Sequence, residues 1–210
     1  MLIYKNINTE YTIGIWQITE PADALLDLLD KNEADLLRSM NLAESRLLEK
    51  AAIRVLLAQL AGNEAKIAYR DNGKPYLESH SLGISISHTK GYAAILLADS
   101  NHLGIDIEYV SDRVNRIRSR FISNEEYINQ QDETMHLLLH WSAKETMYKA
   151  LSMDKIDLKN DFRISRFEPA ESGTFLGQEN FSQKKLCFQI QYITSADYVL
   201  TYTMYPTNSN

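Results

Sequence analysis

Apolar and polar residues recur with two different periods along the first part of the chain. Residues 11–18 (YTIGIWQI) are rich in β-branched and aromatic side chains, a composition typical of a β-strand. From Pro21 onward the apolar residues recur with helical spacing, and residues 44–60 predict a longer helix that stops at Gly62. This part of the chain is therefore predicted to form a strand followed by helices.

The remaining pattern returns to strands, then to helices, and then to strands again. Short strands separated by turn signals are predicted at residues 67–69, 83–87, 92–98 and 103–108. A helical pattern in several pieces covers residues 113–153, and further strands are predicted at residues 187–193 and 198–205. We therefore expect an α+β fold made of two α+β halves, residues 1–108 and 109–210.

The composition of the 210-residue chain, with 44% hydrophobic and 24% charged residues, is typical of a soluble globular protein. Its net charge of −6 argues against nucleic acid as a partner, so an anionic substrate has to be met by a local basic patch. The single cysteine, Cys187, excludes an intramolecular disulfide and a cysteine-based zinc site. The first residues lack the features of a signal peptide, and the longest apolar run, residues 92–98, is too short to span a bilayer. We expect a cytoplasmic protein without a membrane partner.

The segment LGIDIE (103–108) places two carboxylates on one face of a predicted strand. Ile105 and Ile107 share the apolar face, so Asp106 and Glu108 project together from the opposite face. Neighbouring carboxylates repel each other unless a cation lies between them, and Mg²⁺ accepts such oxygen ligands together with phosphate oxygens. The segment thus predicts a magnesium site, and the alternative is an exposed acidic strand end.

Another unusual carboxylate lies in WSAKETMYKA (141–150). With helical spacing, Glu145 shares a face with Trp141 and Tyr148 and is set among large apolar side chains. A charge buried there without a partner is costly, so Glu145 requires one. Either Lys149, one helical turn later, or a metal ion can supply the opposite charge, and the sequence leaves both open.

Ser87 and His88 end a predicted strand and invite comparison with a nucleophile–base pair. Neighbouring residues on a strand point to opposite faces, so these side chains cannot form that pair. Taken alone, His88 is typical of a hydrogen-bonded structural histidine. Lys74, in a turn between Gly73 and Pro75, is placed for a phosphate contact.

His136 and His140 stand one helical turn apart, as the histidines of some zinc sites do. The glutamate of the HExxH motif is missing, and the neighbouring sequence supplies no further ligand. We therefore reject a zinc site at these two histidines.

Taken together and in this order, these segments resemble the 4′-phosphopantetheinyl transferase superfamily, in its surfactin-synthetase-activating (Sfp-like) branch. The matching pieces are GKPYL (73–77), ISISHT (84–89), GIDIE (104–108), RFISNEEY (120–127) and WSAKETMYKA (141–150). GIDIE and the W-x-x-K-E-x-x-x-K pattern are each moderately specific, and their order and spacing argue against a chance match. The resemblance implies two similar α+β halves packed as a pseudo-dimer, with the site in the cleft between them.

The resemblance also implies roles for individual residues. The metal ligands for Mg²⁺ would be Asp106, Glu108 and Glu145. The residues that hold coenzyme A would be Arg46, Lys74, Ser87, His88 and Lys149. The catalytic residues would be Glu126, as the general base, together with Glu145 and Lys149. From the residues alone, Glu126 is also explained as an acidic residue in the first turn of a helix capped by Ser123 or Asn124.

The implied activity is the magnesium-dependent transfer of the 4′-phosphopantetheine group of coenzyme A to a serine of an acyl or peptidyl carrier protein, which releases 3′,5′-ADP. Magnesium and Lys149 would neutralise charge on the pyrophosphate. The alternatives are a non-catalytic module that binds coenzyme A or a carrier protein, and a magnesium-dependent hydrolase of nucleotide pyrophosphates. The implied architecture lets a monomer hold a whole site. Arg113, Arg116 and Arg120 recur with helical spacing and predict a docking stripe for an acidic carrier, or an ordinary solvated helix face.

Overall fold

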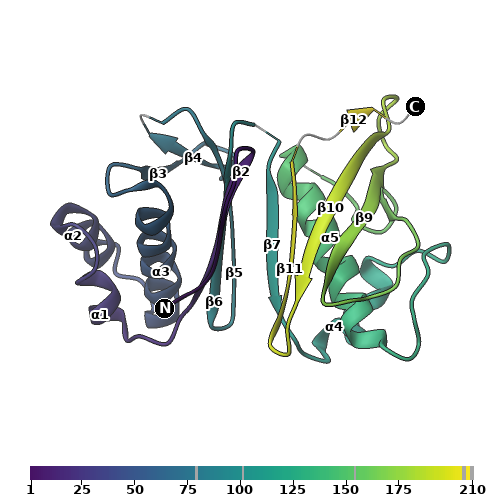
Figure 1. Ribbon diagram of the computed structural model, residues 1–210, viewed down its shortest axis with the longest axis horizontal. Coiled ribbons are helices and arrows are strands. Elements are labelled where there is room, and N and C mark those ends of the chain that lie inside the picture. The colour runs from purple at the N-terminus through teal and green to yellow at the C-terminus, as the bar shows by residue number, and fades with distance from the viewer. Residues whose placement is uncertain (79, 101, 154, 205–206, 209–210) are drawn as a thin grey trace. The chain divides into compact units, whose positions relative to one another are not determined.

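The computed structural model shows a mixed α+β protein, as expected, whose chain divides into two compact units (Figure 1). The structure describes residues 1–78, 80–100, 102–153, 155–204 and 207–208. Unit 1 is Met1–Asp99 and unit 2 is Ser100–Asn210. The segment LGIDIE falls in unit 2, whereas the sequence pattern placed the boundary after residue 108. The reason is strand pairing, because this segment forms an edge of the sheet in unit 2.

Unit 1 combines helices with an antiparallel sheet and a short hairpin. Its elements are β1 (Leu2–Ile7), β2 (Tyr11–Gln17), α1 (Ala22–Leu26), α2 (Lys31–Ser39), α3 (Glu44–Ala61), β3 (Lys66–Tyr69), β4 (Pro75–Glu78), β5 (Gly83–Thr89) and β6 (Tyr92–Ala98). The sheet has the order β1-β2-β6-β5, and β3 pairs with β4. The strand predicted at residues 11–18 and the helix predicted at residues 44–60 are confirmed as β2 and α3, while β1 and β4 were not predicted.

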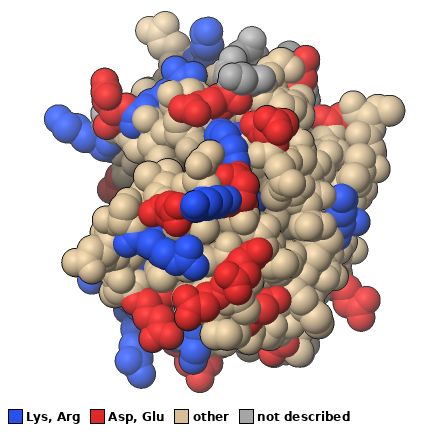
Figure 2. Space-filling view, turned by 90° about the vertical axis from the view of Figure 1, so that its left-hand side faces the viewer, with Lys and Arg blue, Asp and Glu red and all other residues tan. Residues whose placement is uncertain are grey.

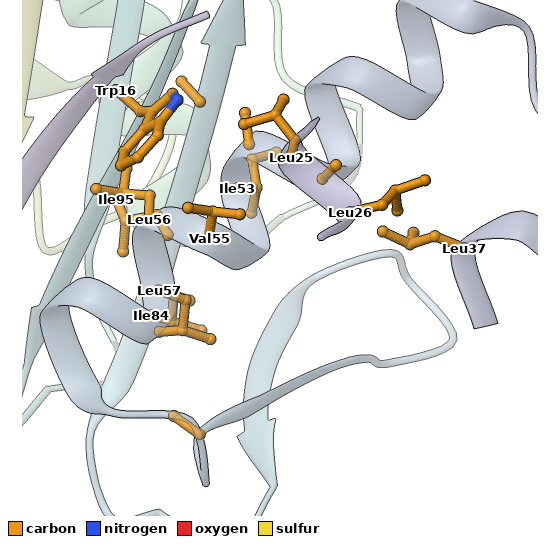
Figure 3. Close-up of a cluster of buried hydrophobic side chains, with 14 of the residues drawn as sticks. Trp16, Leu25, Leu26, Leu37, Ile53, Val55, Leu56, Leu57, Ile84 and Ile95 are labelled. Atoms are coloured by element: carbon orange, nitrogen blue, oxygen red, sulfur yellow. The ribbon is translucent and has the colours of Figure 1, made fainter. Parts of the chain in front are cut away.

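The core of unit 1 is built around α3. Leu56 of this helix belongs to one apolar cluster with Ile84 of β5 and Ile95 of β6 (Figure 3). Helices α1 and α2 add Leu25 and Leu37 to the same cluster. Because α3 contacts the sheet as well as α1 and α2, it is buried along most of its middle. This fixes the position of the N-terminal turns of α3, which carry the basic residues considered below.

Unit 2 packs helices against a longer antiparallel sheet. Its elements are β7 (Gly104–Tyr109), α4 (Arg113–Ile117), the 3₁₀-helix η1 (Arg118–Arg120), α5 (Glu133–Leu151), β8 (Phe162–Ile164), β9 (Ser172–Glu179), β10 (Leu186–Thr194), β11 (Tyr198–Thr203) and β12 (Thr207–Asn208). The sheet order is β7-β11-β10-β9-β8, and β12 pairs with β10. The helical stretch expected at residues 113–153 is therefore interrupted between η1 and α5.

Helix α5 lies directly against β7 and β11 (Figure 1). At Gly104 the two backbones approach so closely that a Cβ atom would lie 2.0 Å from the carbonyl oxygen of Thr146, so a larger residue does not fit. Beside this point, the Oγ1 atom of Thr201 lies 2.9 Å from the hydroxyl of Ser142 and 2.7 Å from the hydroxyl of Thr146. The close contact and the buried hydroxyls hold α5 in one register against the acidic strand.

The other flank of α5 faces the core of unit 2. Leu137 and Met147 belong to an apolar cluster with Phe162 of β8 and Phe188 of β10. Neither this helix nor any other in the described part of the chain is long and apolar enough to cross a membrane. Helix α5 is thus an interior element of unit 2, and one of its flanks presents side chains to β7.

Candidate functional site

The carboxylates that the sequence singled out come together within unit 2. Asp106 and Glu108 project from β7, while Glu145 comes from α5, and the charges of Asp106 and Glu108 both act on the carboxyl group of Glu145. The Asp106 residue is 5% exposed, whereas Glu108 and Glu145 are partly buried. The structure therefore assembles one acidic group from two elements that are distant in the sequence.

Two further side chains of α5 contact the acidic strand. The Nζ atom of Lys149 donates hydrogen bonds to Oδ1 of Asp106 at 2.8 Å and to the carbonyl oxygen of Ile105 at 2.9 Å. The Nε1 atom of Trp141 donates to Oε1 of Glu108 at 2.7 Å. Lys149 thus joins the helix to the strand, a contact that helical spacing alone did not predict.

The surroundings of Glu145 disfavour the charged form of its carboxyl group. Burial raises the pKa of Glu145, and the negative charge of Asp106 raises it further, while the Lys149 ammonium opposes both. The pKa reaches about 7, compared with an ordinary value of 4.5. Glu145 is therefore close to half protonated at neutral pH. An added cation would favour the ionised form, since a nearby positive charge lowers the pKa of a carboxyl group.

The donor set has the chemistry that magnesium prefers, because it consists of carboxylate oxygens. Within the described residues, no group of three or more His, Cys, Asp and Glu side chains is arranged to hold a metal ion as it stands. In the present conformation, Asp106 contacts Lys149 and Glu108 contacts Trp141. The residues therefore fit magnesium by their chemistry, and their present contacts are with protein groups.

Two of the residues expected to hold coenzyme A meet in unit 1. Arg46 is on the first turn of α3, and His88 is near the end of β5. Both contact the same oxygen of Glu49, with Oε2 lying 3.1 Å from the Arg46 guanidinium and 3.5 Å from Nδ1 of His88. The acidic residue thus links two cationic or potentially cationic groups, and an anionic ligand would have to compete with it.

Basic residues continue along the same helix. Lys50 and Arg54 follow Arg46 at intervals of one turn, and burial together with these two neighbouring guanidinium groups lowers the pKa of Lys50. Arg54 is 7% exposed and pairs with Glu33 at 2.5 Å, which makes it a structural residue. On the face of the molecule that Figure 2 shows, acidic and basic side chains are interspersed. Of these three residues of α3, Arg46 and Lys50 are therefore the ones suited to an anionic ligand.

Lys74 and Ser87 occupy different surroundings. Lys74 follows Gly73, whose φ of 79° is the left-handed conformation that favours glycine in the β3–β4 turn. Partial burial, followed by the charge of Arg70, lowers the pKa of Lys74. Ser87 is buried, and strand alternation directs it to the sheet face opposite His88. The adjacent Ser87 and His88 therefore do not form a shared site in unit 1.

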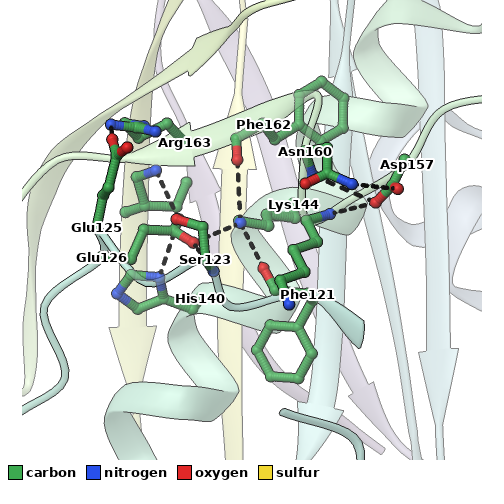
Figure 4. Close-up of polar contacts among 12 residues, drawn as sticks. Phe121, Ser123, Glu125, Glu126, His140, Lys144, Asp157, Asn160, Phe162 and Arg163 are labelled. Atoms are coloured by element: carbon green, nitrogen blue, oxygen red, sulfur yellow. Dashed lines mark hydrogen bonds and ion pairs between the residues drawn. The ribbon is translucent and has the colours of Figure 1, made fainter. Parts of the chain in front are cut away.

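Glu126 lies in the interior of unit 2 (Figure 4). Its side chain is fully inaccessible, and it accepts hydrogen bonds from the backbone N–H groups of Ser123 and Ile164 and from Nζ of Lys144, at 2.9, 2.9 and 2.8 Å. Burial alone would raise its pKa, but His140 and the Lys144 ammonium lower it to about 2. No helix begins at residues 123–126, so the helix-start interpretation is wrong, and a buried carboxylate with this pKa is poorly suited to act as a general base.

His136 and His140 lie beside Glu126 among aromatic rings. The ring of Phe167 contacts both histidines, with centroid distances of 4.4 Å to His136 and 5.5 Å to His140. The Nδ1 atom of His136 accepts a hydrogen bond from the backbone N–H of Asn129 at 2.9 Å. Burial, with a contribution from His140, lowers the pKa of His136 to about 4. Both rings are therefore neutral parts of the core at physiological pH.

Sequence reasoning missed Lys144 as an individual residue. It is 0% exposed, which is unusual for lysine, and its ammonium group contacts acceptors from three segments of the chain. The available signal was its place on the helix, since His140 lies one turn before it on the same flank of α5. Sequence reasoning assigned no partner to this lysine.

Comparison with known families matches part of this chain. The model of the 4′-phosphopantetheinyl transferase superfamily matches residues 102–203, and no curated protein matches the chain. The matched stretch contains Asp106, Glu108, Glu145 and Lys149, while the basic residues of unit 1 lie outside it. The stretch that is similar to this superfamily therefore includes the acidic group.

Proposed function

We propose that this protein, through the 4′-phosphopantetheinyl transferase superfamily domain in residues 102–203, transfers the phosphopantetheine group of coenzyme A to a serine of a carrier protein. The observation that carries the proposal is the meeting of Asp106, Glu108 and Glu145 with Lys149 inside the matched stretch. Burial and the charge of Asp106 raise the pKa of Glu145, which is unfavourable for stability, and carboxyl groups perturbed in this way are concentrated at functional sites.

The acidic group suits the pyrophosphate end of coenzyme A when magnesium is bound. Asp106, Glu108 and Glu145 would hold the ion, which supplies positive charge at the phosphate oxygens. Lys149 lies within hydrogen-bond distance of Asp106, so its ammonium group is placed to bind and orient a phosphate oxygen of the substrate. Trp141 fixes one oxygen of Glu108 and so orients that carboxylate.

In the proposed reaction the hydroxyl oxygen of the carrier serine attacks the β-phosphorus of coenzyme A. The new oxygen–phosphorus bond forms as the bond to the bridging pyrophosphate oxygen breaks, and 3′,5′-ADP leaves with the electron pair. The serine proton passes to an acceptor other than Glu126, because that carboxylate is buried and already accepts hydrogen bonds at both oxygens. Positioning and charge neutralisation would supply most of the rate.

The basic residues of unit 1 would hold the nucleotide phosphates. Arg46 and His88 are supported by their common contact with Glu49, which is the place where a phosphate group could take over the role of the carboxylate. Lys74 is supported by its position in a tight turn beside Arg70. Ser87, on the opposite sheet face, would require a separate part of the coenzyme A molecule.

Intact-protein mass spectrometry tests the proposal. An apo carrier protein incubated with the enzyme, Mg²⁺ and coenzyme A should gain the mass of one phosphopantetheine group. Asp106→Asn, which keeps the shape and removes the charge, should abolish that gain, while the exposed Glu171→Gln should leave it unchanged. Release of free phosphopantetheine without a mass gain would show a hydrolase instead, and tight binding without turnover would show a non-catalytic module.

A further inference from the structure

We propose that the buried ion pair between Lys144 and Glu126 is a positioning pair, which sets the orientation of α5 and thereby directs Glu145 toward Asp106 and Glu108. This inference rests on the proposed function, because it assigns a role to residues that support the acidic site. It replaces the general-base role that the family resemblance implied for Glu126. The pair acts through the helix and contacts no reacting group.

The contacts of Lys144 account for every donor of its ammonium group. It donates to the carbonyl oxygens of Phe121 at 2.5 Å and Phe162 at 3.1 Å, and to Oε2 of Glu126 at 2.8 Å (Figure 4). These acceptors belong to the segment after η1, to β8, and to the turn at residues 123–126. A single side chain of α5 therefore holds three separate parts of unit 2 at a fixed distance from the helix.

Glu126 completes this arrangement from the opposite side. One oxygen accepts from the backbone N–H of Ser123 and from Lys144, and the other accepts from the backbone N–H of Ile164 in β8. The carboxylate thus ties its own turn to the sheet as well as to α5. Since its side chain is 0% exposed, neither a carrier serine nor a bulk water molecule reaches it in this structure.

The helix transmits this restraint to Glu145, the next residue. Consecutive residues of an α-helix point about 100° apart, so a lysine fixed toward β8 and Phe121 determines where the following side chain points. On the flank of α5 that faces β7 and β11, Thr146 meets Gly104 of β7, and Ser142 meets Thr201 of β11. Helix α5 is therefore held on both flanks, and rotation about its axis would break one set of contacts or the other.

Energetic considerations favour a positioning role over a purely stabilising one. Burying two charges costs free energy that their attraction only partly recovers, and apolar replacements of similar volume are often as stable or more stable. A buried pair does impose one specific geometry, because every remaining donor and acceptor must also be satisfied. Lys144 and Glu126 meet this condition with backbone groups of Phe121 and Ser123 and of the strand β8.

The paired substitution Lys144→Met with Glu126→Leu tests the proposal without leaving a single buried charge. Magnesium binding is measured without substrate, by calorimetry and by the magnesium-dependent rise of the unfolding midpoint, at temperatures where the protein is fully folded. Supporting residues of metal sites typically change metal affinity about 10- to 100-fold, so a weakening of that size is expected, together with slower transfer. If the pair serves only the stability of the fold, the double substitution should lower the folded fraction and leave the magnesium affinity of the folded protein unchanged.

A matched control is the buried pair of unit 1, with Arg54→Met and Glu33→Leu, which should not weaken magnesium binding. Should the paired substitution in unit 2 prevent folding, Glu126→Gln gives a second measurement with little change in volume. If Glu126 is a positioning residue, Glu126→Gln should weaken magnesium binding and leave the acid limb of the pH–rate profile in place. Loss of that limb in the variant would show that Glu126 is a general base and would overturn the proposal. Wild-type magnesium affinity in the folded variants would also overturn it. If the variants bind magnesium more weakly but the wild type modifies no carrier, the proposed function is refuted and the positioning role of the pair is not.

Discussion

Replacing Glu145 with glutamine is expected to stabilise the metal-free protein at alkaline pH while abolishing transfer. Burial, together with the charge of Asp106, raises the pKa of Glu145 in the folded state from 4.5 to about 7. The folded protein then binds more protons than the unfolded chain between those two values, so its stability falls as the pH rises through this window. A pKa difference of that size changes the free energy of unfolding by about 3 kcal/mol, at about 1.4 kcal/mol per pH unit.

Denaturant unfolding in the presence of a chelator measures this effect. At about pH 5 the wild type and Glu145→Gln should be similarly stable, whereas at about pH 8.5 the variant should be more stable by up to about 3 kcal/mol. The exposed Glu171→Gln serves as a control for the substitution itself and should show no such dependence on pH. An equal effect of Glu145→Gln at both pH values would refute the reasoning that repulsion and burial disfavour the charged carboxylate.

Magnesium should reverse the order of stability. The ion favours the ionised Glu145, so it should raise the unfolding midpoint of the wild type more than that of Glu145→Gln. The same experiment at lower pH should show weaker magnesium binding, because protons compete for the carboxylate. A midpoint that does not respond to magnesium in the wild type would count against the metal assignment.

The remaining predictions concern packing, acid stability and the partner surface. Gly104→Ala should destabilise unit 2 by about 1–3 kcal/mol in denaturant unfolding, because its Cβ would lie 2.0 Å from the Thr146 carbonyl oxygen. Because the pKa of His136 is lowered from 6.5 to about 4, stability should fall as the pH drops through that range, by up to about 3 kcal/mol, and His136→Gln should reduce this loss. Reversing the exposed Arg116 and Arg120 to Glu should raise KM for an acidic carrier and leave KM for coenzyme A unchanged, and equal effects on both would refute docking there.

Local periodicity predicted most strands whose burial pattern is simple. Residues 83–87 and 92–98 form β5 and β6 because their apolar side chains pack into the unit 1 core or pair within its sheet. The edge strand β1 was not predicted. Its apolar residues Ile3 and Ile7 are exposed, so the strand lacks the regular alternation of buried apolar and exposed polar residues. The boundary near residue 108 was misplaced because β7 pairs with β11, which lies far along the chain. Long-range pairing of this kind leaves no local signal.

The acidic site was predictable to the extent that it depends on one strand and one helix. Alternation on β7 placed Asp106 and Glu108 on the same face, and helical spacing marked Glu145 as a carboxylate that needs a partner. The contact from Lys149 to Asp106 depends on the close approach of α5 at Gly104, which only the three-dimensional structure shows. For the same reason, Glu126 could not be recognised as a buried residue, because its partners come from α5 and β8.

The W-x-x-K-E-x-x-x-K pattern looks like one motif in the sequence, but its residues lie on two flanks of α5. Trp141, Glu145 and Lys149 follow one another at intervals of four, which places them together on the flank that contacts β7. Lys144 lies outside that series and points into the protein. Helical spacing therefore separates the residues that can meet a substrate from the one that holds the helix. If this division is right, Glu145→Gln should abolish transfer and raise stability at alkaline pH. The Lys144→Met and Glu126→Leu pair should instead slow transfer without adding any dependence of stability on pH in the range where Glu145 titrates, because it leaves the carboxylates of the acidic site in place.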